Sequence, residues 1–205
     1  MDEPLLLATR SAGKLRELEP LCAAFGLTVT DLRAAGVPES PLEDSVESFD
    51  TFEENALAKA RYFHALTGRP SLADDSGLEV AALQGRPGVR SKRWSGRDDL
   101  TGLALDAENN RLLQEKLGGA RDRSARYVCA AAFVDGTREL VVRGAVEGRI
   151  VSEPAGTNGF GYDPYFFSSE LGRTFGEASI AEKATVSHRA RAFVALLRAV
   201  GGQNR

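Results

Sequence analysis

The sequence predicts a mixed α/β fold, and three observations lead to this prediction. First, 205 residues with 42% hydrophobic and 27% charged residues suit one globular domain, or one domain with a small lobe. Second, short apolar runs in the N-terminal half alternate with helical apolar patterns. Third, the stretch 127–151 is rich in β-forming residues and contains a turn signal. We therefore expect a single domain over residues 1–205.

The N-terminal segment predicts a strand, a loop and a helix, in that order. The apolar run at 5–7 forms the strand, and leucines at helical spacing follow the loop 9–13. We expect Pro20 to kink or interrupt this helix, because proline lacks the amide hydrogen, and Gly26 to end it. A second strand is predicted over 27–32.

The segment 36–50 has prolines and acids but no periodicity, so it predicts a long loop of a kind that is often functional. A helix then begins after Thr51, which has the capping-box spacing to Glu54, and it ends at Gly68. A short buried strand at 71–73 follows and leads directly into two aspartates.

The C-terminal half predicts a helix, then a β-hairpin or meander, then a last helix. Asp135-Gly136 is a two-residue turn signal that separates two β-forming segments. The expected elements are a helix over 100–117, strands over 127–134, 139–143 and 145–151, and one continuous helix over 182–200.

Composition and charge argue against several classes of function. The formal net charge of −3 disfavours a nucleic-acid scaffold, since a protein that tracks many phosphates usually carries a basic face. The acidic N-terminus differs from a signal peptide, and no apolar run is long enough to cross a bilayer. Cys22 and Cys129 are too few for a disulfide framework or a thiolate zinc site. These features favour a cytoplasmic protein without a nucleic-acid or membrane partner.

The loop after the first strand predicts an anion-binding turn. It reads Thr9-Arg10-Ser11-Ala12-Gly13-Lys14. The P-loop pattern does not match, because Ala8 and Leu15 stand where that pattern requires glycine and Ser or Thr. A tight turn of small residues still presents backbone N–H groups and a helix N-terminus to phosphate, with Lys14 as a cation. The alternative reading of Lys14 is a solvated surface lysine.

Asp74 and Asp75 predict a cation site, because two adjacent acids after a buried strand are costly without compensation. We expect them at a strand end that faces a crevice. Neighbouring side chains of an extended chain point in opposite directions, so one should face a metal and the other should brace the loop. Glu47 could supply a second carboxylate. The alternatives are an Asp-capped turn and a solvated Glu47.

Two C-terminal segments offer groups suited to a flat, charged ligand. The segment 157–164 alternates glycine with aromatic residues, so backbone and ring can approach a base closely. His188 and Arg189 offer planar donors for purine carbonyls or phosphates. The alternatives are a glycine turn with core aromatics and a His-Arg pair on a helix surface.

In this order and spacing, the clusters resemble the inosine triphosphate pyrophosphatase family over nearly the whole chain. The matching segments are 9–14, 47–56, 73–78, 160–163, 182–183 and 187–189. The resemblance implies a mixed α+β fold with an elongated mixed β-sheet, flanking helices and two lobes around a central cleft, in a homodimer. It also implies hydrolysis of noncanonical purine nucleoside triphosphates (dITP, ITP and XTP) to the monophosphate and pyrophosphate, with Mg²⁺ as the cofactor.

Residue roles are implied by the resemblance, position by position. Asp75 would be the proton acceptor for the attacking water and, together with Glu47, a magnesium ligand. The triphosphate would be held by Thr9, Arg10, Ser11, Ala12, Gly13, Lys14, Lys59, Ser76 and Lys183, with Lys92 as an additional phosphate ligand. The base pocket would be lined by Phe160, Gly161, Tyr162, Asp163, His188 and Arg189.

The chain departs from the family pattern at three places, one of which is Ser91-Lys92-Arg93-Trp94, where bacterial members commonly have Ser-Ala-Arg-Tyr. Ser11 stands where the family has asparagine; it can still bond a phosphate, but with a shorter reach. Ser48 and Phe49 replace the Thr-Gly that follows the metal-ligand glutamate. Two other readings stay open: a Maf-type pyrophosphatase that acts on pyrimidine or modified nucleotides, and a nucleotide sensor without turnover.

Overall fold

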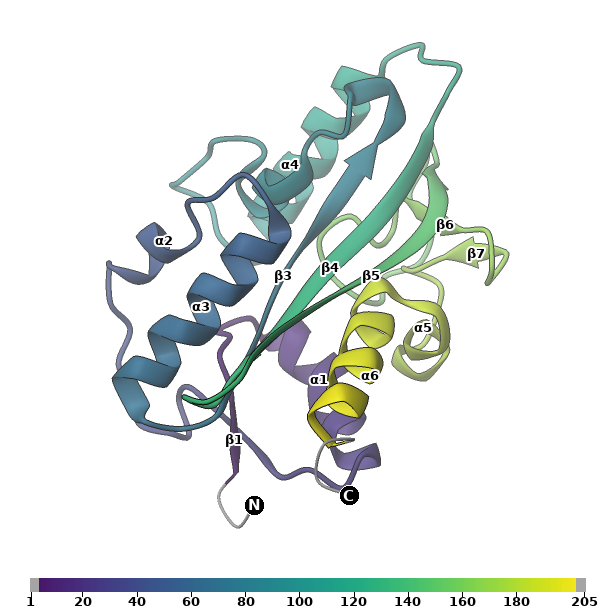
Figure 1. The fold of residues 1–205 in the computed structure, drawn as a ribbon. Helices are drawn as coiled ribbons and strands as arrows, with labels where there is room; N and C mark the ends of the chain where they lie inside the picture. Colours follow the sequence, from purple (N-terminus) through teal and green to yellow (C-terminus); the bar gives the residue numbers. More distant parts are fainter. Residues whose placement is uncertain (1–3, 202–205) are drawn as a thin grey trace. The chain divides into compact units, whose positions relative to one another are not determined.

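The computed structural model describes residues 4–201, which adopt a mixed α/β fold with one seven-stranded sheet (Figure 1). The strand order is β2-β1-β3-β4-β5-β6-β7. The pairs β1–β2 and β1–β3 are parallel, whereas β5–β6 and β6–β7 are antiparallel, so the predicted mixed sheet is confirmed. The strands are β1 Leu5–Leu7, β2 Val29–Asp31, β3 Ser71–Val80, β4 Ser124–Val134, β5 Glu139–Ile150, β6 Phe166–Ser168 and β7 Arg173–Thr174.

The helices lie between these strands and at the C-terminal end of the described chain. They are α1 Ala12–Ala24, α2 Glu43–Val46, α3 Phe52–Thr67, α4 Gly102–Leu117, α5 Ile180–Val186 and α6 His188–Gly201, with 3-10 turns η1 Ala81–Leu83 and η2 Gly88–Arg93. Within residues 4–201, none of these helices has the length and apolar character needed to span a membrane.

The described chain divides into two compact units. The first contains residues 4–75, 129–144 and 189–201, and the second contains 76–128 and 145–188. The chain passes from one unit to the other within β3, β4 and β5 and again at the start of α6.

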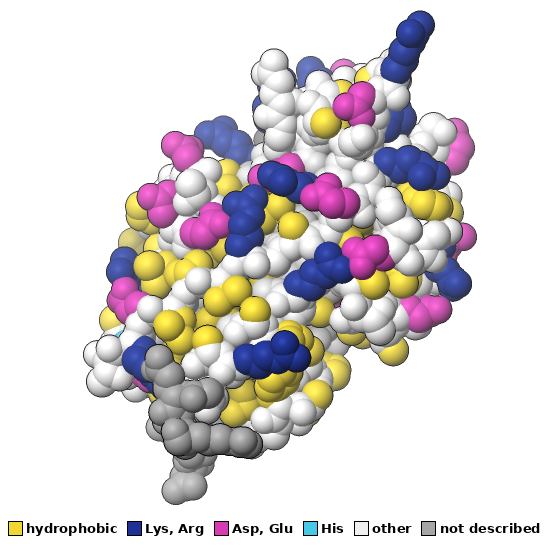
Figure 2. Space-filling model, turned by 45° about the vertical axis from the view of Figure 1, so that its right-hand side comes forward, with side chains coloured by type: hydrophobic (Ala, Val, Ile, Leu, Met, Phe, Trp, Pro, Cys, Tyr) yellow, Lys and Arg dark blue, Asp and Glu magenta, His cyan; other side chains and the backbone are white. Residues whose placement is uncertain are grey.

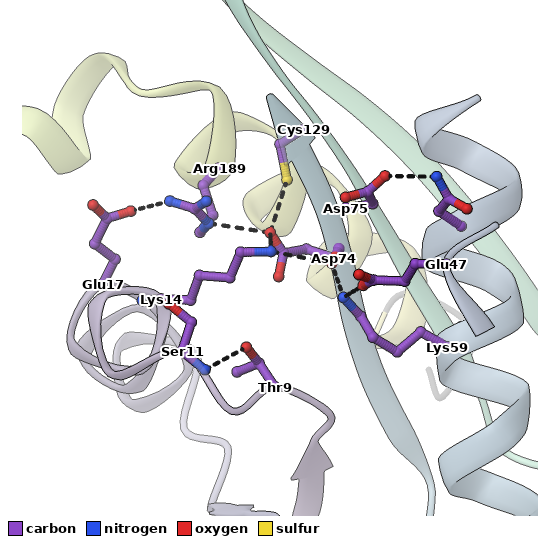
Figure 3. A network of polar contacts seen from close by, with 11 residues as sticks. Thr9, Ser11, Lys14, Glu17, Glu47, Lys59, Asp74, Asp75, Cys129 and Arg189 are labelled. Carbon is purple, nitrogen blue, oxygen red and sulfur yellow. Dashed lines mark hydrogen bonds and ion pairs between the residues drawn. The ribbon is translucent and has the colours of Figure 1, made fainter. Parts of the chain in front are cut away.

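The core of the first unit lies between its strands and the helices α1 and α6, which are side by side in Figure 1. Leu5 and Leu7 of β1 enter this core together, as the two-residue period of a strand requires. Phe193 of α6 is fully buried there, and α1 contributes Leu18 and Cys22. The helix α3 lies on the other side of the strands (Figures 1 and 3).

The helix α1 continues through Pro20, so the predicted interruption is wrong. Leu18 and Cys22 flank the proline and are buried, and their packing outweighs the one backbone hydrogen bond that proline cannot form. The predicted end is confirmed: the helix stops at Ala24, and Gly26 follows with φ +70°. Residues with a Cβ rarely adopt this conformation.

The local capping signals predicted both ends of α3 correctly. Thr51 accepts a hydrogen bond from the amide of Glu54, and Gly68 ends the helix with φ +71°. The predicted loop over 36–50 contains a short helix, α2, and the predicted strand over 27–32 is shortened to Val29–Asp31.

The second unit packs its core between α4 and strand residues of β3 to β6. Leu113 and Leu117 of α4 meet Phe166 of β6 and Phe175, which follows β7. The turn at Asp135 and Arg138, with an N–O distance of 3.2 Å, joins β4 to the neighbouring β5, as the predicted hairpin requires.

Two expectations for the C-terminal half need correction. The strand β5 runs without interruption over Glu139–Ile150, where two segments were predicted. The single last helix is two helices, because Ser187 is extended (φ −66°, ψ 150°) and separates α5 from α6. Neither glycine nor proline marks this break, since residues 180–200 contain neither. The short strands β6 and β7 were not predicted.

Acidic and basic side chains are interspersed on the face shown in Figure 2. Exposed ion pairs in the described chain include Arg61 with Glu139 and Arg111 with Glu115. Exposed pairs of this kind contribute little to stability, because water screens them.

Candidate active site

Two adjacent aspartates in the middle of β3 organise a polar cluster within the first unit (Figure 3). Because side chains alternate along a strand, Asp74 points toward α1 and α6, whereas Asp75 points toward α3. The predicted opposite directions are therefore confirmed. The predicted strand end is wrong, because β3 continues to Val80. It can do so because basic and amide groups from other elements compensate both acids.

Asp74 is a buried anion held by two cations. Its side chain is 1% exposed, and its Oδ2 lies 3.0 Å from Lys14 Nζ and 3.3 Å from Arg189 Nε. Cys129 Sγ lies 3.9 Å from the same oxygen. Although burial raises the pKa of Asp74, the charges of Lys14, Arg189 and Lys59 lower this pKa well below its usual range. Asp74 thus stays ionised and holds Lys14 and Arg189 in place. We had expected it to stabilise a loop instead.

Arg189 lies inside this network as the second residue of α6. Its side chain is 3% exposed and pairs with Glu17 of α1 as well as with Asp74. Burial lowers the pKa of Arg189, but Glu17 and Asp74 raise it above its ordinary value. Its guanidinium, expected at a base, is here bound to two carboxylates of its own unit.

The predicted anion-binding turn forms the N-terminus of α1. Ser11 is the N-cap residue and accepts a hydrogen bond from the amide of Lys14, while its own amide donates to Thr9 Oγ1 at 3.2 Å. Ala12 and Gly13 open the first turn. The short side chain of Ser11 suits a cap, which gives this departure from the family pattern a structural role. The predicted contacts with phosphate stay predictions.

Arg10 turns away from this helix N-terminus and anchors the following loop. Its guanidinium forms two hydrogen bonds with Glu43, at 3.1 and 2.7 Å, and donates to the carbonyls of Val37 and Pro38. These contacts occupy its side chain, so only its backbone is placed for an anion at α1.

Asp75 lies against α3, where Asn55 fixes its orientation. Asn55 Nδ2 donates to Asp75 Oδ2 at 3.0 Å, and the same amide also bonds the backbone of Phe49. Asp75 is 8% exposed. Burial, with a smaller contribution from the charge of Glu47, raises the pKa of Asp75 to about 6, against the opposing effect of Lys14 and Lys59.

Lys59 connects the acids of this side. Its ammonium pairs with Glu47 Oε1 and donates to the backbone carbonyl of Asp74 at 2.5 Å. Burial raises the pKa of Glu47, but the charges of Lys59 and Lys14 lower it, so Glu47 is an anion. The structure thus brings Glu47, Lys59 and Asp75 together in one unit, although they are distant in sequence.

The donor set fits Mg²⁺ bound together with a phosphate ligand. Within residues 4–201, no group of three or more His, Cys, Asp or Glu side chains forms a ready metal site. Mg²⁺ commonly uses one or two carboxylates and completes its shell with water and substrate phosphates. Glu47 and Asp75 supply two such carboxylates, and the Glu47 charge raises the pKa of Asp75, a repulsion that a cation relieves.

The second unit carries the remaining predicted residues. Ser76 follows Asp75 on β3, and Lys92 is exposed on η2. Ser91, next to Lys92, fixes this turn, because its hydroxyl accepts from the amide of Leu78 at 2.8 Å and donates to the carbonyl of Gly88 at 2.6 Å.

The loop 160–163 is held by a buried ion pair. Lys183 Nζ lies 2.6 Å from Asp163 Oδ2, which also accepts from the amide of Phe160 at 2.9 Å. The ammonium of Lys183 lies 5.2 Å from the ring centre of Phe160 and 5.1 Å from that of Phe175, within the range of cation–π contacts. A Cβ on Gly159 would come within 2.0 Å of Asp163 Oδ2, so glycine is required there.

Two residues predicted at a base lie in the core of the second unit. Tyr162 is 4% exposed, and its hydroxyl donates to the carbonyl of Ser91 at 2.8 Å. His188 is 2% exposed and stacks on Tyr127 with ring centres 4.6 Å apart. Tyr162 thus holds the backbone of Ser91, His188 packs on the Tyr127 ring, and Phe160 is more accessible than either.

Sequence reasoning missed several residues that organise this site. Asn55 and Glu17 lie within predicted helices, where a polar side chain gives no local signal of a role in a site. Their partners, Asp75 and Arg189, lie 20 and 172 residues away in sequence. The same holds for Asp106, Asn109 and Asn110 of α4, which bond the loops of the second unit.

Comparisons with known proteins converge on one family. A family model described as "Ham1 family" matches residues 5–199. The chain is 49% identical over 201 residues to a dITP/XTP pyrophosphatase of Mycolicibacterium paratuberculosis, with 96% of this chain and 95% of that protein covered. It is 43% identical over 199 residues to a dITP/XTP pyrophosphatase of Neisseria meningitidis serogroup B, with 96% of each covered.

Solved structures agree with these sequence matches. A HAM1 protein from Coxiella burnetii has a TM-score of 0.82 at 37% identity, covering 97% of this chain and 98% of that one. The Ham1 protein of Staphylococcus aureus has a TM-score of 0.81 at 31% identity, with 98% and 100% covered.

Proposed function

The chain belongs to the Ham1 family, and we propose that it hydrolyses the noncanonical purine nucleoside triphosphates dITP, ITP and XTP to the monophosphate and pyrophosphate. Relatives that match nearly the full chain are named dITP/XTP pyrophosphatases. One observation carries the proposal in the structure: Asp75 is a buried, oriented carboxylate of raised pKa beside Glu47 and two lysines.

Asp75 is suited to accept the proton of an attacking water. Its pKa of about 6 makes it more basic than an ordinary aspartate while leaving it mostly ionised at neutral pH. Asn55 holds Oδ2, so the orientation of the carboxylate is fixed before substrate binds. Attack on the α-phosphorus would release pyrophosphate, whose charge Lys14 and Lys59 can neutralise.

Glu47 and Asp75 would hold the metal. A bound Mg²⁺ would supply Lewis-acid stabilisation of charge on the phosphate oxygens. Lys59 lies against Glu47 and the carbonyl of Asp74, so its ammonium is already placed beside this pair. The N-terminus of α1 offers amide hydrogens to a further phosphate, with Ser11 as its cap.

The second unit would supply the contacts to the base. Phe160 presents a ring for stacking, and Lys183 and Asp163 fix its backbone. Lys92 is exposed, and the resemblance assigns it to a phosphate. Tyr162 and His188 support these segments from the core.

The test is Asp75→Asn, assayed by pyrophosphate release from dITP with Mg²⁺. The amide keeps the shape and the bond to Asn55 but cannot take the proton, so turnover should fall more than a hundredfold. The melting temperature should stay equal or rise, because a neutral amide is buried more readily than a carboxylate. Asp98→Asn, at an exposed position, is the matched control. Turnover within tenfold of wild type, which is about 1.4 kcal/mol of barrier, would refute the assignment of Asp75.

A nucleotide panel separates the proposed activity from its alternatives. We expect dITP and XTP to be preferred over dTTP and UTP. Preference for the pyrimidines would favour a Maf-type activity, and binding without pyrophosphate release would favour a sensor.

A homodimer and a cytoplasmic location belong to the same proposal, since the resemblance implies the first and composition favours the second. Light scattering after gel filtration measures the assembly: a mass of about 44 kDa, twice the 22.0 kDa of one chain, is expected.

A further inference from the structure

The helix α4 of the second unit uses one polar face to hold two loops. Asp106, Asn109 and Asn110 are spaced three and four residues apart, which places them on one side of a helix. Asn109 and Asn110 are 3% and 7% exposed, and Asp106 is half-buried.

Asp106 and Asn110 grip both ends of one residue, Gly161. Asp106 Oδ2 accepts from the amide of Gly161 at 2.8 Å, and Asn110 Nδ2 donates to its carbonyl at 2.9 Å. Gly161 has φ +64°, a conformation that glycine adopts readily and that residues with a Cβ rarely adopt. The two side chains therefore set the orientation of the backbone between Phe160 and Tyr162.

Asn109 likewise holds the backbone of the turn that carries Lys92. Its Nδ2 donates to the carbonyl of Lys92 at 3.0 Å, and its Oδ1 accepts from the amide of Ser95 at 2.8 Å. Both the oxygen and the nitrogen of this buried amide are therefore hydrogen-bonded. Lys92 lies near the end of η2, and Ser95 follows it.

Burying polar side chains is costly unless hydrogen bonds compensate it, and compensated groups specify one conformation. Asn109 uses both ends of its amide, whereas Asn110 uses its Nδ2 and its buried Oδ1 has no hydrogen-bond partner among the described residues. A helix completes its own backbone hydrogen bonds without such residues, although Asn110 Nδ2 also donates to the carbonyl of Asp106 at 2.9 Å. Apolar side chains at the same positions would pack α4 without fixing the two loops, so the polar face serves the loops.

We propose that Asp106 and Asn110 are positioning residues that set base specificity through Gly161, and that Asn109 positions Lys92 in the same way. This inference rests on the proposed function, because Phe160 to Asp163 and Lys92 are assigned to the nucleotide only there. Discrimination of a 6-keto from a 6-amino purine depends on polar groups at fixed positions, and a loop that moves leaves them misplaced. The residues act through the loops and do not touch substrate.

The experiment compares Asp106→Ala and Asn110→Ala with the conservative Asp106→Asn, which keeps an acceptor for the Gly161 amide. Arg111→Ala, on the exposed face of α4, is the matched control. For each protein, kcat and KM are measured with dITP and with dATP, and thermal unfolding confirms that the variant is folded.

In both alanine variants, kcat/KM for dITP divided by kcat/KM for dATP should fall by about tenfold, because each variant loses one hydrogen bond to the loop. The fall should come chiefly from a higher KM for dITP. Asp106→Asn should restore the ratio to within about threefold of wild type. A merely structural role would lower kcat for both nucleotides equally and leave the ratio unchanged. Ratios within twofold of wild type in both folded alanine variants overturn the proposal.

The wild-type measurement separates this inference from the proposed function. If the wild type releases no pyrophosphate from dITP, the proposed function fails, and calorimetric titration with dITP and dATP then replaces turnover as the readout of specificity. Equal changes in the affinity for both nucleotides would overturn the positioning role, and so would an absence of dITP binding to the wild type.

Discussion

Asp74→Asn should destabilise the protein strongly although it changes only one atom. Asp74 is 1% exposed, and its carboxylate is the shared partner of Lys14 and Arg189. The amide keeps the volume and can still accept one hydrogen bond, but it removes the negative charge between two buried or half-buried cations. The change therefore isolates the charge from the packing.

The structure gives the magnitude of this effect. Removing one partner of a buried ion pair costs about 3–5 kcal/mol, because the remaining charge is left uncompensated. Arg189 keeps Glu17, and Lys14 keeps the backbone carbonyl of residue 74 at 3.3 Å, so the lower end applies. A loss of about 3 kcal/mol corresponds to a fall in melting temperature of about 6–12 °C in a chain of this size.

Urea and thermal unfolding followed by circular dichroism measure the difference. Asp99→Asn removes one member of the exposed pair with Arg97 and is the control, whose melting temperature should equal that of the wild type. If Asp74→Asn lowers the free energy of unfolding by less than about 1 kcal/mol, the network does not hold this part of the fold and the reasoning from burial is wrong.

Two further predictions address Lys14 and the turn after β4. If the Lys14 ammonium binds phosphate as proposed, Lys14→Ala should raise KM for dITP more than it lowers kcat. An unchanged KM, with exposed Lys116→Ala as control, would remove Lys14 from the proposed phosphate site. Asp135 accepts hydrogen bonds from Thr137 and Arg138, which lower its pKa although burial raises it. A lowered pKa stabilises the fold above the unfolded value of about 3.9. The melting temperature of Asp135→Asn should thus fall below wild type at pH 7. This gap should begin to narrow below about pH 4, the unfolded value, and narrow further as the pH falls toward the lower folded-state pKa; a gap that stays constant down to pH 2 would contradict the assignment.

Elements with local signals could be predicted from the sequence. Thr51 and Gly68 bound α3 because a cap and a left-handed glycine act on the adjacent backbone. A shared site for Glu47 and Asp75 was also expected, because Glu47 could supply a second carboxylate to the same cation. The place of Lys59 was implied only by the family resemblance, since no local pattern places residues this far apart in one cluster. The roles of these residues stay predictions.

Features that depend on distant partners could not be predicted. The strand β3 passes through two acids because Lys14 and Arg189, which are 60 and 115 residues away from Asp74, compensate its charge. Ser187 breaks the last helix although the apolar period continues across it. Asn109 and Asn110 look like ordinary polar residues of a helix until the loops that they bond are known.

The two aspartates of β3 show how one strand can place neighbouring acids in different environments, which suits the structural role of Asp74 and the chemical role proposed for Asp75. They are neighbours in sequence, yet the alternation of side chains places them in opposite environments, and their pKa values shift in opposite directions. Asp74 faces cations and becomes a permanent anion, whereas Asp75 faces an amide and a second carboxylate and becomes more basic. Pairs of acids whose environments drive their pKa values apart are typical of acid–base sites. Because Lys59 donates to the carbonyl of Asp74, the backbone between the two acids also fixes a cation beside Asp75. A change at Asp74 should therefore reach the chemistry at Asp75 through this shared strand.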